Sequence, residues 1–285
     1  MNAPTIINFN NFDVKRVTLH KNPPKPKRPA MFSLKYDGQN FQLRFPAKMS
    51  SRLFTQVDEE TGKISYVLSA NMKNVDPYAK ERSTGTTDMD KLYNTLAFDL
   101  KDKILDTAEQ NSIEWFKEEM TRPEILKHSY NEMYKLSVTK DDKGMYAPNG
   151  KYPPTVRVKV PVWEGKVTCQ VVDSSLHDVY VTPETLDKVF LNNMDVNMIV
   201  VPSVYASKAN CGVTFRLAFA QIFPKQRLTA ASVFTIEDNN DAEEENEEER
   251  EEERVAEPEV EAPVQKEVTV TTTTAPARKK RTAAH

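Results

Sequence analysis

The chain is poor in glycine and cysteine, and both shortages exclude classes of protein. Only 7 of its 285 residues are glycine, and none forms the G-x-G-x-x-G or G-x-x-x-x-G-K pattern that cradles a nucleotide phosphate. The two cysteines, Cys169 and Cys211, lack C-x-x-C spacing, which argues against a disulfide framework and a thiolate metal site. The sequence therefore disfavours nucleotide hydrolysis and favours a reducing compartment.

Long apolar runs and clusters of metal ligands are missing as well. No stretch approaches the roughly 20 apolar residues of a membrane helix, and the first residues lack the apolar core of a signal peptide. The four histidines share no metal-ligand spacing. Asp88 and Asp90 are paired carboxylates, but helix capping alone accounts for acids at a helix start. We expect an intracellular protein that is not an enzyme and needs no cofactor, metal or membrane.

Charge is divided unevenly along the chain. Residues 1–236 contain 32 basic and 26 acidic residues, whereas residues 237–261 contain 15 acidic and 2 basic ones. A segment this acidic cannot bury enough apolar surface to fold, so we expect residues 237–285 to be disordered, with a basic cluster at 278–281 near their end. A positive body with a negative tail is typical of a polyanion-binding protein whose tail competes for the same surface.

Alternating apolar residues predict the first strands. Residues 32–36 and 41–45 alternate around Asp37 and Gly38, which predicts a hairpin, and a third strand is expected at 64–71. Between 88 and 120 the apolar spacing becomes helical, with Asp88 as the expected N-cap. A short helix near 123–128 and a strand at 134–139 follow.

Strands return in the second half of the folded region. Residues 155–163 and 166–172 form a predicted hairpin around Glu164 and Gly165, and a short helix capped by Thr182 is expected at 183–190. Two long strands, 196–205 and 212–223, are expected to pair. The fold class is mainly β with a helical insert: an OB-fold-like antiparallel barrel of about five strands, with the helix between the third and fourth.

Three parts follow from this organisation. Residues 1–29 form an N-terminal segment that ends in a basic, proline-rich strap at 21–29. Residues 30–236 form one OB-fold-like domain with its helical insert at 88–128, and residues 237–285 form the tail.

Outward positions on the strands indicate what the domain binds. If the valines at 156–162 point inwards, Arg157, Lys159 and Trp163 point outwards together. Cations of this kind track phosphates, and an exposed aromatic stacks on a base with about 1–3 kcal/mol per base. We therefore expect a nucleic-acid-binding set, with no catalytic and no metal-binding residues, made of Lys35, Arg44, Tyr146, Tyr152, Arg157, Lys159, Trp163 and Arg216.

Each member of that set has an ordinary alternative role. Any soluble strand exposes Lys and Arg to water, so no single cation decides the function. Tyr146 and Tyr152 lie in a lysine- and proline-rich loop, where they either reach a base or pack onto the barrel. Other aromatic residues lie on inward registers and are expected in the core: Phe32, Phe41, Phe45, Phe215 and Phe219.

The end of the body resembles a known family. A strand of the type GVTFRLAFAQIF at 212–223, preceded by an apolar strand and a short helix and followed by an acidic tail, resembles the single-stranded DNA-binding proteins of large nucleocytoplasmic DNA viruses. These are similar in turn to the OB-fold replication proteins of podoviruses. The likeness extends over residues 30–236 and is most specific at 155–223. The phage proteins close their tail with an aromatic residue, whereas here a basic cluster and His285 follow the acids.

This resemblance implies a protein that coats unwound single-stranded DNA in viral replication and recombination. It further implies a tail that competes with DNA and recruits DNA polymerase or other replication proteins, in the host nucleus or a viral replication factory. The basic cluster at 278–281 then serves as a nuclear import signal or as additional grip on DNA.

Two other functions are compatible with parts of the sequence. A virion component, or an acidic-tailed chaperone of basic proteins, accounts for the tail equally well. It does not require Arg157, Lys159 and Trp163 on one face. A metal-dependent nuclease ranks third, because no dense carboxylate cluster occurs outside the tail.

Overall fold

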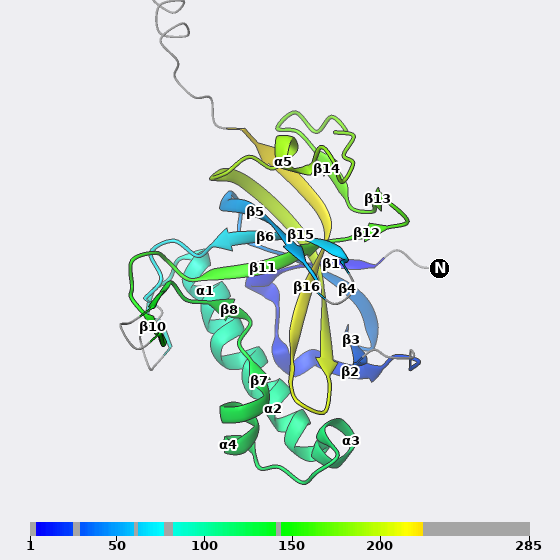
Figure 1. Cartoon of the computed structure of the whole chain (residues 1–285), viewed down its shortest axis with the longest axis vertical. Coiled ribbons are helices and arrows are strands. Elements are labelled where there is room, and N and C mark those ends of the chain that lie inside the picture. The colour runs from blue at the N-terminus through cyan, green and yellow to red at the C-terminus, as the bar shows by residue number, and fades with distance from the viewer. Residues whose placement is uncertain (1–3, 25–28, 60–61, 77–81, 141–143, 225–285) are drawn as a thin grey trace, which may run out of the picture. The chain divides into compact units, whose positions relative to one another are not determined.

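Five strands pair into a closed ring (Figure 1). In ring order they are β5 (Met49–Val57), β6 (Ile64–Asn71), β11 (Thr155–Val160), β16 (Cys211–Phe223) and β15 (Met194–Ala206). Each strand pairs with the next, and β15 closes the ring by pairing with β5. Four of the seams are antiparallel, whereas β11 and β16 run parallel. The expectation of a purely antiparallel barrel is therefore wrong at this one seam.

The computed structural model describes residues 4–24, 29–59, 62–76, 82–140 and 144–224. The acidic tail and the middle of the proline-rich strap lie outside these ranges. No helix in the described ranges is long and apolar enough to cross a membrane.

Strict alternation of burial fills the ring. Val156, Val158 and Val160 are buried, and Arg157 and Lys159 between them are exposed. Along β15 every second residue is buried over all 13 positions. The prediction of inward valines is thus confirmed for Val156, Val158 and Val160, whereas Val162 belongs to a separate short strand and is only partly buried. The pairing of the two long strands is also confirmed.

The predicted hairpin at 32–45 is confirmed and lies beside the ring. It consists of β3 (Ala30–Tyr36) and β4 (Gln39–Arg44), joined at Asp37 and Gly38. Both turn residues have positive φ, 48° and 76°, as a two-residue hairpin turn requires. β3 and β4 also pair with β15, so the hairpin enlarges the sheet rather than entering the ring.

Two strands precede this hairpin. β1 (Thr5–Asn8) runs parallel to β4, and β2 (Val17–Lys21) runs antiparallel to β3. The sheet therefore begins well before residue 30, where the sequence analysis placed the start of the folded domain. The remaining short elements are η1 (Phe9–Asn11), η2 (Val14–Arg16), β7 (Tyr130–Asn131), β8 (Tyr134–Lys135), β9 (Val138–Lys140), β10 (Tyr146–Pro148), β12 (Val162–Trp163), β13 (Lys166–Val167) and β14 (Gln170–Val172).

Some predicted elements are shorter than expected. The strand expected at 134–139 is divided between β8 and β9. The second hairpin is confined to β12 and β13, because β11 ends before Pro161, which has no backbone N–H to donate to the ladder. The turn residues Glu164 and Gly165 have positive φ, as a tight turn requires.

The helical insert lies between β6 and β11, the second and third strands of the ring. The predicted strand at 64–71, counted third in the sequence, does precede the insert; it is only the second strand of the ring because the hairpin at 32–45 lies outside the ring. Along the chain, the short helix α5 (Leu186–Val189) lies between β11 and β15. β5 was not predicted, since its first half reads Met-Ser-Ser-Arg rather than as an alternating pattern. The elements of the insert are α1 (Asp88–Asn94), the π-helical turn η3 (Thr95–Asp99), α2 (Leu100–Gln110), α3 (Ser112–Phe116), α4 (Arg122–Glu124) and the π-helical turn η4 (Ile125–Ser129).

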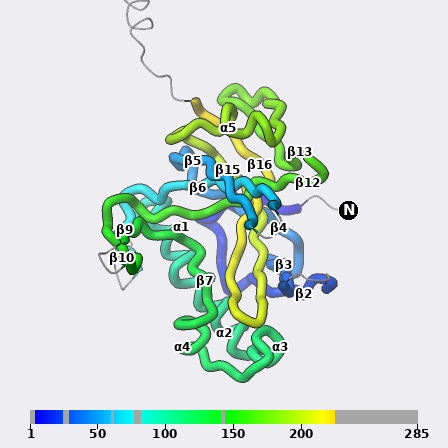
Figure 2. Tube along the Cα trace, in the orientation of Figure 1, coloured from blue at the N-terminus to red at the C-terminus, as the bar shows by residue number. Residues whose placement is uncertain are grey.

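The insert packs by its predicted apolar stripe. Leu92, Leu96, Leu100 and Ile104 are all buried in the common core. Figure 2 shows the long β15–β16 hairpin reaching towards this insert, where Cys211 pairs with Tyr130 of β7. The insert is therefore part of the folded unit rather than an appendage.

A β-bulge in β16 reverses which residues face outwards. Ile199 of β15 pairs with Phe219, but the next residue, Val200, pairs with Leu217, which leaves Ala218 extra. Up to the bulge Phe215 and Leu217 are buried, whereas beyond it the buried residues are Ala220 and Ile222. Phe219 is consequently 39% exposed, and its prediction as a core residue is wrong. The other predicted core aromatics are buried: Phe32, Phe41, Phe45 and Phe215.

Two helix caps differ from the prediction by one to three positions. α1 is capped by Thr87 instead of Asp88, and α5 by Thr185 instead of Thr182. At α1 the carboxylate of Asp90 completes a capping box with Thr87. Asp90 is buried and accepts hydrogen bonds from the Ser83 and Thr87 hydroxyls, each at 2.6 Å. These bonds hold the pKa of Asp90 below its usual value.

Replacing Asp90 is expected to make stability depend less on pH. Because the Asp90 pKa is lower in the folded than in the unfolded chain, its stabilisation is present at neutral pH and is lost as the pH falls through the folded-state pKa. Asp90→Ala should cost about 1–2 kcal/mol at neutral pH, and this difference from wild type should shrink in acid. Urea unfolding at several pH values measures it, with the exposed Asp88→Ala as the matched control. A difference that stays constant down to acid pH would contradict this role.

Candidate nucleic-acid interface

Outward residues of all five ring strands form one row. The strand registers place Phe54, Val67, Lys159, Arg216 and Val201 in sequence across β5, β6, β11, β16 and β15. Lys159 and Arg216 are neighbours across the parallel seam, and both are exposed. The parallel pairing thus brings together two cations that lie far apart in the sequence.

The ring strands are positive. They contain four basic residues and a single acid, Asp195. By contrast, the helices and π-helical turns of the insert contain eight acids and five bases. The four basic residues of the ring are Arg52, Arg157, Lys159 and Arg216.

None of these four cations belongs to an ion pair among the described residues. The ion pairs found there involve Arg16, Lys21, Arg82, Lys101, Arg122 and His177. The guanidinium carbon Cζ of Arg52 instead lies 5.0 Å from the centre of the Phe54 ring, which is itself partly exposed. The outward cations of the ring are therefore available to an external anion.

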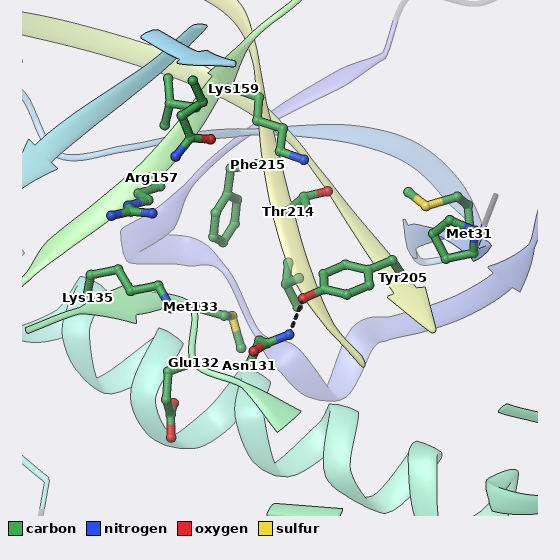
Figure 3. A pocket seen from close by; sticks show the side chains of 14 residues that line it. Met31, Asn131, Glu132, Met133, Lys135, Arg157, Lys159, Tyr205, Thr214 and Phe215 are labelled. Atoms are coloured by element: carbon green, nitrogen blue, oxygen red, sulfur yellow. Dashed lines mark hydrogen bonds between the residues drawn. The ribbon is translucent and has the colours of Figure 1, made fainter. Parts of the chain in front are cut away.

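A pocket of about 400 Å³ opens on this face. Figure 3 shows Arg157 and Lys135 on one side of it and Tyr205 and Met31 on the other, with Thr214 and Phe215 between them. The complete lining is Pro29, Met31, Gln56, Val67, Asn131, Glu132, Met133, Lys135, Arg157, Lys159, Tyr205, Val213, Thr214 and Phe215.

One wall of the pocket is fixed by a close contact. The Tyr205 hydroxyl accepts a hydrogen bond of 2.7 Å from Asn131 Nδ2, and burial raises the Tyr205 pKa. Gly212 pairs with both residues in the sheet. A Cβ atom at Gly212 would lie 2.9 Å from the Tyr205 hydroxyl and 3.1 Å from the Asn131 carbonyl oxygen, so glycine is needed for this approach.

Glu132 is the acidic member of the lining, and its charge is balanced. Its carboxylate forms an ion pair with Lys101 of α2, and in Figure 3 it points away from the other labelled side chains. The pocket is therefore dominated by the three cations Lys135, Arg157 and Lys159.

The structure separates the predicted binding residues into groups. Arg157 and Lys159 line the pocket, and Arg216 adjoins Lys159. Lys35 and Arg44 lie on β3 and β4, outside the pocket lining. The Lys35 side chain bonds to Asn40, and Arg44 pairs with Ile199, whose partner on β16 is the outward Phe219.

The three predicted stacking residues lie near opposite ends of β11. Tyr152 precedes the strand and Trp163 follows it, and they are 60% and 66% exposed. Tyr146, on β10, is 71% exposed. Lys140 lies over the Tyr146 ring and Lys151 over the Tyr152 ring, at 6.0 and 5.5 Å. Although these lysines lie over one face of the two tyrosine rings, all three aromatic side chains remain at least 60% exposed.

Sequence reasoning missed several residues of this face. Arg52, Phe54 and Gln56 belong to the unpredicted β5. Tyr205 was read only as the end of an apolar strand, and Lys135 lies in a strand of two residues. The predicted strand at 196–205 already included Tyr205, and its alternation is the signal that places this residue on the same side as Val201 and Ser203.

The described residues offer little for metal or thiol chemistry. No three His, Cys, Asp or Glu side chains among them are placed to hold a metal ion. Burial raises the pKa of Cys169 to about 11 and that of Cys211 to about 12, so both thiols stay protonated at neutral pH.

Comparisons with known proteins give structural likenesses only. No family model matches the chain, and no curated protein matches it. The single-stranded DNA-binding protein of bacteriophage Enc34, solved in complex with ssDNA, aligns at 10% identity with a TM-score of 0.32 over 74% of this chain and 97% of that one. The same phage protein without DNA gives a TM-score of 0.30 at 10% identity, over 76% and 99%.

The single-stranded DNA-binding protein gp2.5 of bacteriophage T7 is also similar. It is 10% identical, with a TM-score of 0.41 over 66% of this chain and 94% of that one. Identities and TM-scores this low leave the function to be inferred from the surface of this chain.

A methyl group at Gly212 is expected to disturb the pocket wall. Gly212→Ala should lower the free energy of unfolding by about 1–3 kcal/mol, because the added carbon crowds the Tyr205 hydroxyl. In a Tyr205→Phe background the nearest clashing atom is gone, so the same substitution should cost less. Chemical denaturation of the two single variants and the double variant measures this coupling. Equal costs in both backgrounds would show that the hydroxyl is not the limiting contact.

Proposed function

We propose that this protein binds single-stranded DNA without sequence specificity, through the outward face of its ring. The observation that supports this most directly is the adjacency of Lys159 and Arg216, with Arg157 beside them, none of them in an ion pair among the described residues. Unneutralised cations on neighbouring strands suit a chain of phosphates better than one isolated anion.

The exposed aromatics favour a single strand over a duplex. A base can stack on Tyr152 or Trp163 only if it is unpaired. The six residues of β11 between these two span roughly 20 Å, with Arg157 and Lys159 along the way. A strand lying along β11 would meet an aromatic ring, two cations and a second ring in turn.

The biological setting belongs to the same proposal. The protein acts in viral DNA replication and recombination, in the host nucleus or a replication factory, and does not catalyse a reaction. Its acidic residues 237–261 compete with DNA for the cationic face and recruit DNA polymerase or other replication proteins. The support for these roles is the opposite charge of body and tail, and the family resemblance of the sequence.

Removing two cations of the face is expected to weaken DNA binding and its salt dependence. Each phosphate contact on a single strand contributes about 0.7 to the slope of log affinity against log salt, so Arg157→Ala with Lys159→Ala should reduce that slope by roughly 1.4. Fluorescence titration with an oligothymidine at several salt concentrations measures it. Trp163 is exposed and Trp115 is buried, so quenching should report on Trp163.

The matched control removes the same charge elsewhere. Lys91 and Lys127 are exposed on the helical insert, and the Lys91→Ala, Lys127→Ala variant should bind almost as wild type does. If both double variants lose affinity and slope equally, net charge rather than the ring face is responsible. A duplex of equal length, bound as tightly as the single strand, would also contradict the proposal.

Deleting residues 237–285 is expected to raise the affinity for oligothymidine, since a competing polyanion is removed. The gain should be largest at low salt, where the attraction between tail and body is least screened. The same titration on the two chain lengths tests it. Unchanged or weaker binding by the shorter chain would count against competition. If neither chain binds DNA but the full chain binds a basic protein, the alternative of an acidic-tailed chaperone gains support.

A further inference from the structure

The pocket beside Lys159 is larger and more apolar than a surface that contacts only phosphates needs to be. Part of its lining, which we call the floor, is apolar and consists of Val67 and Met133, which are 3% and 5% exposed, and the partly buried Val213. Its volume of about 400 Å³ lies in the range of small-ligand pockets. A phosphate, which needs water or polar partners, gains nothing from an apolar floor.

The walls of the pocket differ in chemistry. On one side stands the Tyr205 ring, held by its bond to Asn131 and by the close approach of Gly212. On the other side are Lys135 and Arg157 (Figure 3). An aromatic wall, an apolar floor and a cationic rim together suit a flat ring attached to phosphates.

We propose that this pocket takes one unpaired base of the bound strand, with Tyr205 as its stacking wall and with Arg157 and Lys159 holding the flanking phosphates. This inference rests on the proposed binding of single-stranded DNA and adds a determinant of selectivity to it. A duplex would have to unpair and unstack a base before the pocket accepted it. The pocket therefore disfavours double strands, in addition to the preference for unpaired bases that the exposed rings at 152 and 163 provide.

Filling the pocket provides the first test. Val213→Phe places a ring on the floor without changing charge. Affinity for an oligothymidine should fall by about 5- to 150-fold, the range that one stacked base contributes. Affinity for an abasic deoxyribose-phosphate chain of equal length should not change. The control is Ile113→Phe, which adds the same ring at an exposed position of α3 and should affect neither ligand.

The outcomes separate the two proposals. If Val213→Phe weakens both ligands equally, or neither, the base-binding pocket is wrong while single-strand binding stands. If the wild-type chain binds no oligothymidine at all, the proposed function itself fails, and the pocket assignment fails with it.

Photocrosslinking of the unmodified full chain gives a second test that does not depend on a variant folding. An oligonucleotide carrying 5-iododeoxyuridine reacts with aromatic side chains that touch the base. Mass spectrometry should find the crosslink on Tyr205. Crosslinks confined to Tyr146, Tyr152 and Trp163 would overturn the assignment of the pocket.

Discussion

Closure of the ring by β15 is the constraint on which the rest of this structure depends. One edge of β15 pairs with β16 along most of its length. The strand also pairs with β5 near its start, with β4 in its middle and with β3 near its end. A closed ring leaves these strands no free edge and fixes which side of each residue is inside. Since the inside is filled mainly by valine, leucine, methionine and phenylalanine, the basic residues of the same strands lie on the outer face. The position of the cations on that face thus follows from a register that the core enforces.

Basic and acidic residues are also distributed differently between the ring and the helical insert. The ring strands present cations outwards with almost no acids among them, whereas the insert is acidic and pairs many of its own charges, as Arg122 does with Asp102 and Asp106. Exposed ion pairs contribute little to stability, so leaving the ring cations unpaired costs the fold little. The positive charge of the outer face therefore depends on the near absence of acids from the ring strands as much as on the four cations themselves.

Local patterns in the sequence predicted much of the fold but little of its closure. The alternation at 155–160, the turn at Asp37 and Gly38 and the apolar stripe from Leu92 to Ile104 are properties of neighbouring residues, and the structure confirms them. The strand at 49–57, the parallel seam and the extra residue Ala218 depend on partners far along the chain, which no window of one sequence contains. For the same reason Arg157 and Lys159 were found from their own strand, whereas the pocket around them, assembled from segments near 31, 67, 131–135, 205 and 213–215, was not.

The seam between β11 and β16 is the shortest in the ring. Two residue pairs join these strands, Val158 with Phe215 and Lys159 with Arg216, against seven between β5 and β6 and twelve between β15 and β16. Strands that are joined by so few residue pairs separate more easily in local opening of the fold. The like charges of Lys159 and Arg216 further weaken the pairing of β11 with β16. An anion lying across both would turn that repulsion into attraction. By linkage, an anion that bound this pair only while the seam is closed would stabilise the closed barrel, and the barrel would loosen when that anion left.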